Sequence, residues 1–249
     1  MNDELNQYIA QIHPPDERAM KEARIRWANV AKPLYSLGVL EEDLIKIAGM
    51  RETSRFQIGK RALFIFCGDN GIVEEGVTQT GKEVTAIVAE NMTEGNSSVC
   101  IMAERAGVDV IPVDMGTARD LHSGTRYPLI QKKIAYGTKN FRKEPAMKRE
   151  EAVLGIMTGI DLVREFKEKG YDLFATGEMG IGNTTTSSAL VSLLLKKDPE
   201  LLTGRGAGLN YEGLLKKRAV ILEAVETYGP LCRDENTVRL TTCSIGTTC

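Results

Sequence analysis

The chain has 249 residues, of which 42% are hydrophobic and 27% are charged, and its formal net charge is −2. This length suits one medium-sized domain, or a domain with a small satellite, and it is sufficient to bury a sizeable core. The near-neutral charge gives no reason to expect a nucleic-acid partner. No apolar run approaches the length of a membrane-crossing helix, so we expect no membrane partner either.

The first 20 residues are polar and acidic and do not resemble a signal peptide. The five cysteines include no Cys-x-x-Cys pair, which argues against both a zinc site and a disulfide framework. These observations favour a cytoplasmic protein with reduced cysteines and no metal site.

The chain begins with helical patterns. Residues 16–31 have the composition of a surface helix, and residues 41–50 resemble the end of a second helix. From residue 61 onward, strands and helices alternate. Residues 61–71, 108–116 and 171–177 are short apolar runs followed by glycine-containing turns, as is typical of buried parallel strands. Helices are predicted at residues 82–95, 97–107, 148–170, 184–196 and 210–226. This alternation predicts an α/β fold with a parallel sheet and helices on both faces.

The stretch "GEMGIGNTTT" follows the strand predicted at residues 171–177. In an open parallel sheet, ligands bind beyond the carboxyl ends of the strands. Gly180 and Gly182 lack a Cβ, so the backbone there can approach a ligand and adopt positive φ. Asn183 or a nearby threonine can cap the next helix, whose free N–H groups suit a phosphate. A plain glycine turn with a threonine cap is the alternative interpretation, and the carboxylate of Glu178 favours a functional site over it.

Two familiar nucleotide-binding patterns are absent from this stretch. No lysine completes a Gly-x-x-x-x-Gly-Lys-Ser/Thr loop, and there is no Gly-x-Gly-x-x-Gly fingerprint for a dinucleotide. A second glycine loop at residues 203–209 precedes another helix and adds Arg205, Lys216 and Lys217. Two glycine loops and a lysine could enclose one phosphate from two sides, although each lysine taken alone is typical of a surface charge.

Four segments, in this order, resemble the nicotinate-nucleotide–dimethylbenzimidazole phosphoribosyltransferase family. They are "KPLYSLGVLEEDLIKIAGM", residues 67–116, "GTKNFRKEPAM", and "GEMGIGNTT" with the later "GRGAGL…LLKK". The resemblance implies transfer of phosphoribose from nicotinate mononucleotide to a benzimidazole base in cobalamin nucleotide-loop assembly, without metal or cofactor. It also implies a homodimer with a Rossmann-like large domain, here residues 51–249. Residues 1–50 are then the N-terminal part of a small helical domain.

The same resemblance assigns site residues by position. It implies nucleotide contacts at Gly180, Gly182, Asn183, Thr184, Gly204, Gly206 and Lys217. It implies a base pocket lined by Thr80, Val88 and Met179, and it places Glu178 beside the nucleotide. We expect Asp69, at the end of a strand, to have a turn or supporting role, and His122 to be a surface residue.

Three features depart from the family pattern. Tyr35 replaces the usual glycine before Ser36, near the base pocket. Val88 stands where a glutamine can occur, so we expect one polar contact to the base to be missing. The resemblance stops near Asp234, whereas family sequences continue and supply further elements and a glutamate that serves as the catalytic base.

The chain therefore resembles a truncated member of the family in which Glu178 is the remaining catalytic candidate. We expect such a chain to be a poor catalyst or none, because loss of a general base removes roughly 10²–10⁴-fold in rate. Two other hypotheses stay open. One is a non-catalytic nucleotide-binding module. The other is an NAD-dependent oxidoreductase, which the missing dinucleotide fingerprint disfavours.

Overall fold

A computed structural model describes residues 2–231 of the chain, with the side chains of residues 4–230. The chain divides into two compact units, with the boundary between Gly59 and Lys60. The first unit contains helices α1 (Asn2–Ala10), α2 (Glu17–Ala28) and α3 (Val39–Met50). The predictions for residues 16–31 and 41–50 are confirmed as α2 and α3, whereas α1 was not predicted.

Helix α2 packs against α3 through small and apolar side chains. Ala23 of α2 and Ile45 and Ala48 of α3 are buried together. The Asp16 side chain accepts a hydrogen bond from the backbone N–H of Ala19 (2.6 Å), which caps the start of α2.

The second unit is built on a four-stranded parallel sheet. Its strands are β1 (Lys60–Gly68), β2 (Asp109–Gly116), β3 (Ile130–Gln131) and β4 (Tyr171–Met179), in the order β3-β2-β1-β4. The predicted parallel sheet is confirmed, and the two-residue β3 is an addition to the prediction. Strand β4 continues two residues beyond the predicted end, so Glu178 and Met179 lie in the strand and not in the loop that was expected there.

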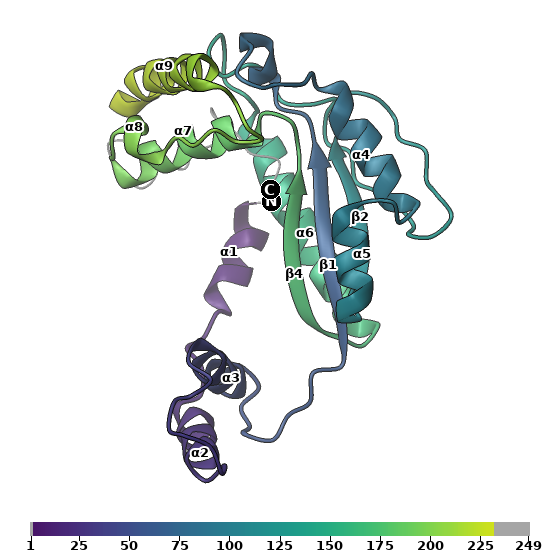
Figure 1. Ribbon diagram of the computed structural model, residues 1–249, viewed down its shortest axis with the longest axis vertical. Coiled ribbons are helices and arrows are strands. Elements are labelled where there is room, and N and C mark those ends of the chain that lie inside the picture. Colours follow the sequence, from purple (N-terminus) through teal and green to yellow (C-terminus); the bar gives the residue numbers. More distant parts are fainter. Residues whose placement is uncertain (1, 232–249) are drawn as a thin grey trace. The chain divides into compact units, whose positions relative to one another are not determined.

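Helices cover both faces of this sheet, as predicted (Figure 1). On one face, α4 (Glu83–Thr93) and α5 (Ser98–Ala106) pack against Ile65 and Cys67 of β1. On the other face, α6 (Arg149–Glu168) covers Phe64, whose ring lies 5.0 Å from that of Phe166. Alternate residues of β1 therefore point to opposite, apolar layers, as in a strand buried on both faces.

Three further helices lie beyond the carboxyl ends of the strands, where the arrowheads point in Figure 1. They are α7 (Asn183–Leu195), α8 (Pro199–Leu202) and α9 (Tyr211–Tyr228), and η2 (Gly229–Leu231) follows α9. Helices α7 and α9 share a buried cluster with Ile72 and Val77, which belong to η1 (Gly71–Glu75) and the segment after it. This packing brings together the turn after β1, the start of α7 and the loop before α9.

Candidate functional site

The turn after β4 packs directly against the turn after β1. A Cβ on Gly180 would lie 2.4 Å from the carbonyl oxygen of Gly68, which is too close for any side chain. Gly182 has a φ of +92°, and a Cβ there would lie 2.9 Å from Cγ2 of Val73. Both glycines are thus required by the protein's own atoms. The positive φ expected in this turn is found at Gly182, and the close approach of a ligand stays a prediction.

The predicted cap of helix α7 is wrong. Its N-cap is Gly182, and no side chain caps the helix start. Asn183 is already inside the helix, and its Nδ2 donates a hydrogen bond to Oε2 of Glu178 (3.1 Å). Within the part of the chain that the structure describes, this helix start is therefore left without a side-chain acceptor, the arrangement that favours an anion.

Lys217, in α9, is buried, with 1% of its surface exposed, so the reading of this lysine alone as a surface charge is wrong. Its Nζ donates hydrogen bonds to Oγ1 of Thr184 (2.7 Å) and to the carbonyl oxygen of Gly204 (3.2 Å). Burial lowers the pKa of Lys217 below its ordinary value. Among the side chains of residues 4–230, no carboxylate forms an ion pair with this ammonium, and its hydrogen-bond partners there are neutral oxygens.

The second glycine loop closes over the same ammonium group. Gly206 has a φ of +57°, and a Cβ there would lie 2.8 Å from Oγ1 of Thr184 and 3.4 Å from Nζ of Lys217. The ammonium group of Lys217 is thus surrounded by three other residues that were predicted to contact the nucleotide. They are Thr184, Gly204 and Gly206. Of the others, Gly180 and Gly182 form the turn before α7, and Asn183 is the first residue of that helix.

The predicted base-pocket residues are only partly brought together. Val88 of α4 and Met179 of β4 pack against the same apolar cluster. Thr80 lies in an exposed loop, where its carbonyl accepts a hydrogen bond from the hydroxyl of Thr78 (2.8 Å). In that loop, Nε2 of Gln79 donates a hydrogen bond to the carbonyl oxygen of Gly208, which ties the loop to the second glycine loop.

Two buried carboxylates lie at the ends of neighbouring strands. Asp69 follows β1, and its Oδ2 accepts a hydrogen bond from the backbone N–H of Ala118 (2.7 Å). Burial raises the pKa of Asp69, whereas the nearby Thr85 side chain and the N–H of Ala118 oppose this rise. Asp114 of β2 forms an ion pair with Lys133 (3.0 Å). These contacts agree with the supporting role predicted for Asp69.

Sequence reasoning missed two buried polar residues beside the turn after β4, Asn70 and Thr85. Asn70 lies in the segment of residues 67–116 that resembles the family, and its position at the end of a predicted strand was the available signal. His122 is exposed, as predicted. Glu235, the one acidic residue that follows Asp234 in the sequence, lies outside the described residues.

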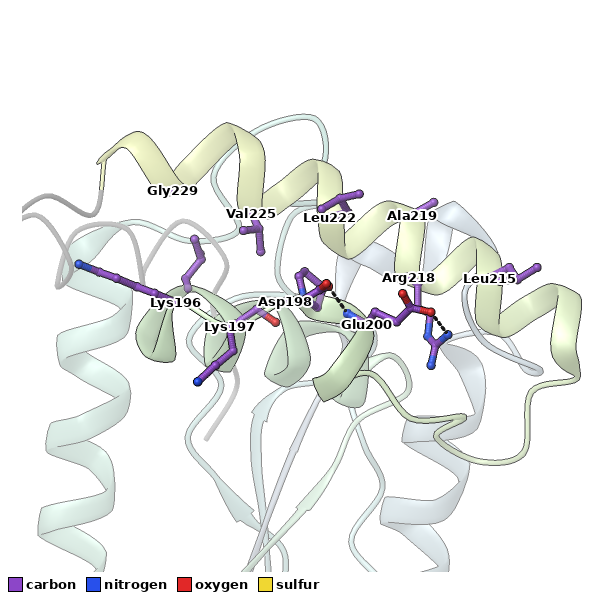
Figure 2. A pocket seen from close by; sticks show the side chains of 13 residues that line it. Lys196, Lys197, Asp198, Glu200, Leu215, Arg218, Ala219, Leu222, Val225 and Gly229 are labelled. Carbon is purple, nitrogen blue, oxygen red and sulfur yellow. Dashed lines mark hydrogen bonds and ion pairs between the residues drawn. The ribbon is translucent and has the colours of Figure 1, made fainter.

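A cavity of about 930 Å³ lies between α7 and α9, away from these residues (Figure 2). Apolar side chains of Leu193, Leu222 and Val225 line it, and Arg218 at its rim is paired with Glu200 (2.8 Å). None of the predicted site residues lines this cavity.

Over residues 2–231, no group of three or more histidine, cysteine or acidic side chains is arranged to hold a metal ion. No helix in the same range is both long and apolar enough to cross a membrane.

The fold and the site define a class: an α/β protein with a parallel sheet whose candidate ligand site lies at the carboxyl edge. A family model described as phosphoribosyltransferase matches residues 12–246. The chain belongs to this family, that of the nicotinate-nucleotide–dimethylbenzimidazole phosphoribosyltransferases. The match continues past Asp234, so the prediction that the resemblance stops there is wrong.

Named relatives and solved structures agree with this assignment. The chain is 42% identical over 226 residues to nicotinate-nucleotide–dimethylbenzimidazole phosphoribosyltransferase of Clostridium tetani, covering 91% of this chain and 62% of the relative. It is 40% identical to the enzyme of the same name from Alkaliphilus metalliredigens, covering 92% of this chain and 65% of the relative. The crystal structure of CobT from Thermus thermophilus superimposes with a TM-score of 0.82 at 31% identity, covering 91% of this chain and 67% of that one. The chain thus spans less than two thirds of the length of these two named relatives.

Proposed function

We propose that the protein transfers the phosphoribosyl group of nicotinate mononucleotide to 5,6-dimethylbenzimidazole or a related base. The products are α-ribazole 5′-phosphate and nicotinate. The observation that carries this proposal is the buried ammonium of Lys217, whose partners among residues 4–230 are neutral oxygens and which lies between two glycine loops and the uncapped start of α7. A buried cation without a counterion is costly, and a phosphate supplies the missing charge.

In the reaction, a ring nitrogen of the base forms a bond to the anomeric carbon while the bond from that carbon to the pyridinium nitrogen breaks. The bonding electron pair goes to nicotinate, whose ring becomes neutral, so the leaving group needs little help from an acid. The second ring nitrogen of the base loses its proton to a carboxylate. The protein also contributes by holding the two substrates face to face.

Glu178 and the apolar side chains of Val88 and Met179 have different roles in this proposal. Glu178 is held by Asn183 at the start of α7, which supports a role beside the nucleotide. Val88 and Met179 supply apolar surface for the base. Thr80, in the exposed loop before α4, would add a hydroxyl group to this pocket. We further propose that the protein acts as a cytoplasmic homodimer, and that residues 1–50 belong to a small helical domain and residues 51–249 to the large one.

The phosphate site is tested by replacing Lys217 and, as a matched control, its exposed neighbour Lys216. Lys217→Met should weaken binding of nicotinate mononucleotide, measured by calorimetry, by about 10–150-fold, because a hydrogen bond to a charged group is worth roughly 1.5–3 kcal/mol. Lys216→Met should leave the affinity within about twofold of the wild type. Equal affinities for all three proteins would refute the site.

Product analysis then tests the reaction itself. The chain is mixed with nicotinate mononucleotide and dimethylbenzimidazole, and we expect α-ribazole phosphate and nicotinate in equal amounts. Binding without any turnover would identify a nucleotide-binding module instead.

A further inference from the structure

Ile181, between the two glycines of the turn after β4, is held at both of its backbone groups by side chains from other elements. Its N–H donates a hydrogen bond to Oγ1 of Thr85 (3.0 Å), and its carbonyl accepts one from Nδ2 of Asn70 (3.3 Å). Thr85 belongs to the first turn of α4, and Asn70 follows β1. Two separate parts of the chain therefore clamp the turn from both sides.

Each of the two clamping side chains is itself buried and oriented. Asn70 is 1% exposed and Thr85 is 0% exposed. Oδ1 of Asn70 accepts a hydrogen bond from the hydroxyl of Thr186 (2.9 Å), which fixes the amide so that Nδ2 faces Ile181. The Thr85 hydroxyl oxygen accepts the Ile181 N–H through one of its lone pairs.

The orientation of Ile181 determines how α7 begins. The next residue, Gly182, is the N-cap in a left-handed conformation, and two residues later Thr184 contacts Lys217. A turn with two glycines in three residues has many conformations open to it, and fixing one of them is costly in entropy. The two side-chain contacts to Ile181 select one conformation before a ligand arrives.

We propose that Thr85 and Asn70 are positioning residues, which hold Ile181 so that the start of α7 is presented to the phosphate group of a nucleotide. The identity of the ligand rests on the proposed function, whereas the clamp rests on the contacts of Ile181. Neither side chain is assigned a contact with the ligand. Preorganisation of this kind raises affinity by reducing the ordering that binding requires.

Thr85 allows a matched set of variants. Thr85→Val keeps the shape and removes the acceptor, while Thr85→Ser keeps the hydroxyl. Thr93→Val is the control, because Thr93 lies in the same helix, is 1% exposed, and makes its hydrogen bonds with Glu90 and Gly124 instead. The readouts are the Kd for nicotinate mononucleotide by calorimetry, and amide hydrogen exchange of Ile181 in the protein without ligand.

Thr85→Val should raise the Kd about tenfold or more, because it leaves a backbone N–H without its partner. It should also speed exchange of the Ile181 amide by a similar factor, whereas Thr85→Ser restores both values to within about threefold of the wild type. Thr93→Val should change neither the Kd nor the exchange rate, although we expect its midpoint of thermal unfolding to fall by as much as that of Thr85→Val. Unchanged affinity in Thr85→Val, or an equal loss in Thr93→Val, would overturn the proposal.

If Thr85→Val does not fold, Thr85→Ala gives the same comparison with serine. If the wild type binds no nicotinate mononucleotide, the proposed function is refuted. The Kd for inorganic phosphate then replaces the Kd for nicotinate mononucleotide in the comparison of variants. The exchange rate of Ile181 does not depend on any ligand. Unchanged exchange in both Thr85→Val and Thr85→Ala refutes the clamp independently of the proposed function.

Discussion

Tyr35 occupies a backbone conformation that suits glycine. Its φ is +57°, in the left-handed region, and 77% of its surface is exposed, so packing offsets little of the strain. A glycine is usual at this position in the family pattern, but the backbone conformation was not predicted from the sequence.

Tyr35→Gly should therefore raise the free energy of unfolding by about 0.5–1 kcal/mol, because the relief of strain exceeds the entropy that glycine adds to the unfolded chain. Urea denaturation of both proteins measures the difference. Gly38 provides the control: its φ of +55° and ψ of −128° are open to glycine only, so Gly38→Ala should destabilise by about 1–3 kcal/mol. A Tyr35→Gly protein no more stable than the wild type would contradict the strain at this position.

Lys217 shows why sequence reasoning found the members of the site but not their environment. Buried residues of α9 recur at helical spacing, at Leu214, Lys217, Ile221 and Ala224. The pattern marks Lys217 as facing inward and Lys216 as facing outward. A lysine is read as exposed by default, because lysines are almost never fully buried. Lys217 departs from this rule because α9 packs on α7 and buries the side chain.

The elements of the second unit were largely predictable, and their junctions were not. The long apolar runs and amphipathic helices of β1, β2 and α6 follow from local pattern. The end of β4 and the cap of α7 depend on contacts with Gly68, Asn70 and Thr85, which lie about a hundred residues earlier in the chain. Such contacts leave no periodic signal in the sequence near Gly180.

The turn between β4 and α7 predicts a sharp difference between two glycines. Gly180→Ala should lower the free energy of unfolding by at least about 2 kcal/mol, because the new Cβ would meet the backbone of Gly68. A Cβ on Gly204 would meet nothing within 4 Å, so Gly204→Ala should change stability by no more than about 0.5 kcal/mol. Thermal unfolding of the two variants measures the effect, and equal midpoints would show that the turn can move away from β1.

At the scale of the whole molecule, the buried ammonium of Lys217 makes stability depend on pH. Its pKa is lowered by burial in the folded protein and is ordinary, near 10.5, in the unfolded chain. Between the two values the unfolded chain binds more protons, so the free energy of unfolding should rise with pH through this range.

Lys217→Met should remove that rise and should be more stable than the wild type at neutral pH without ligand, while it binds phosphate more weakly. Urea denaturation at a series of pH values up to 10.5 measures both effects, and Lys216→Met is again the control. If Lys217→Met retains the full pH dependence, the ammonium is not the group that titrates.

The hydrogen bonds around Ile181 also bear on the order in which the protein folds. They join residues that are 96, 111 and 116 positions apart in the chain. Contacts of such high contact order require long loops to close, and their entropy cost is met only once the intervening strands have paired. We therefore expect the site to form late, after β1 and β4 have come together. Partly folded chains would then lack the site and would not bind a phosphate ligand. The fraction of chains that bind the ligand would therefore equal the fraction that is fully folded.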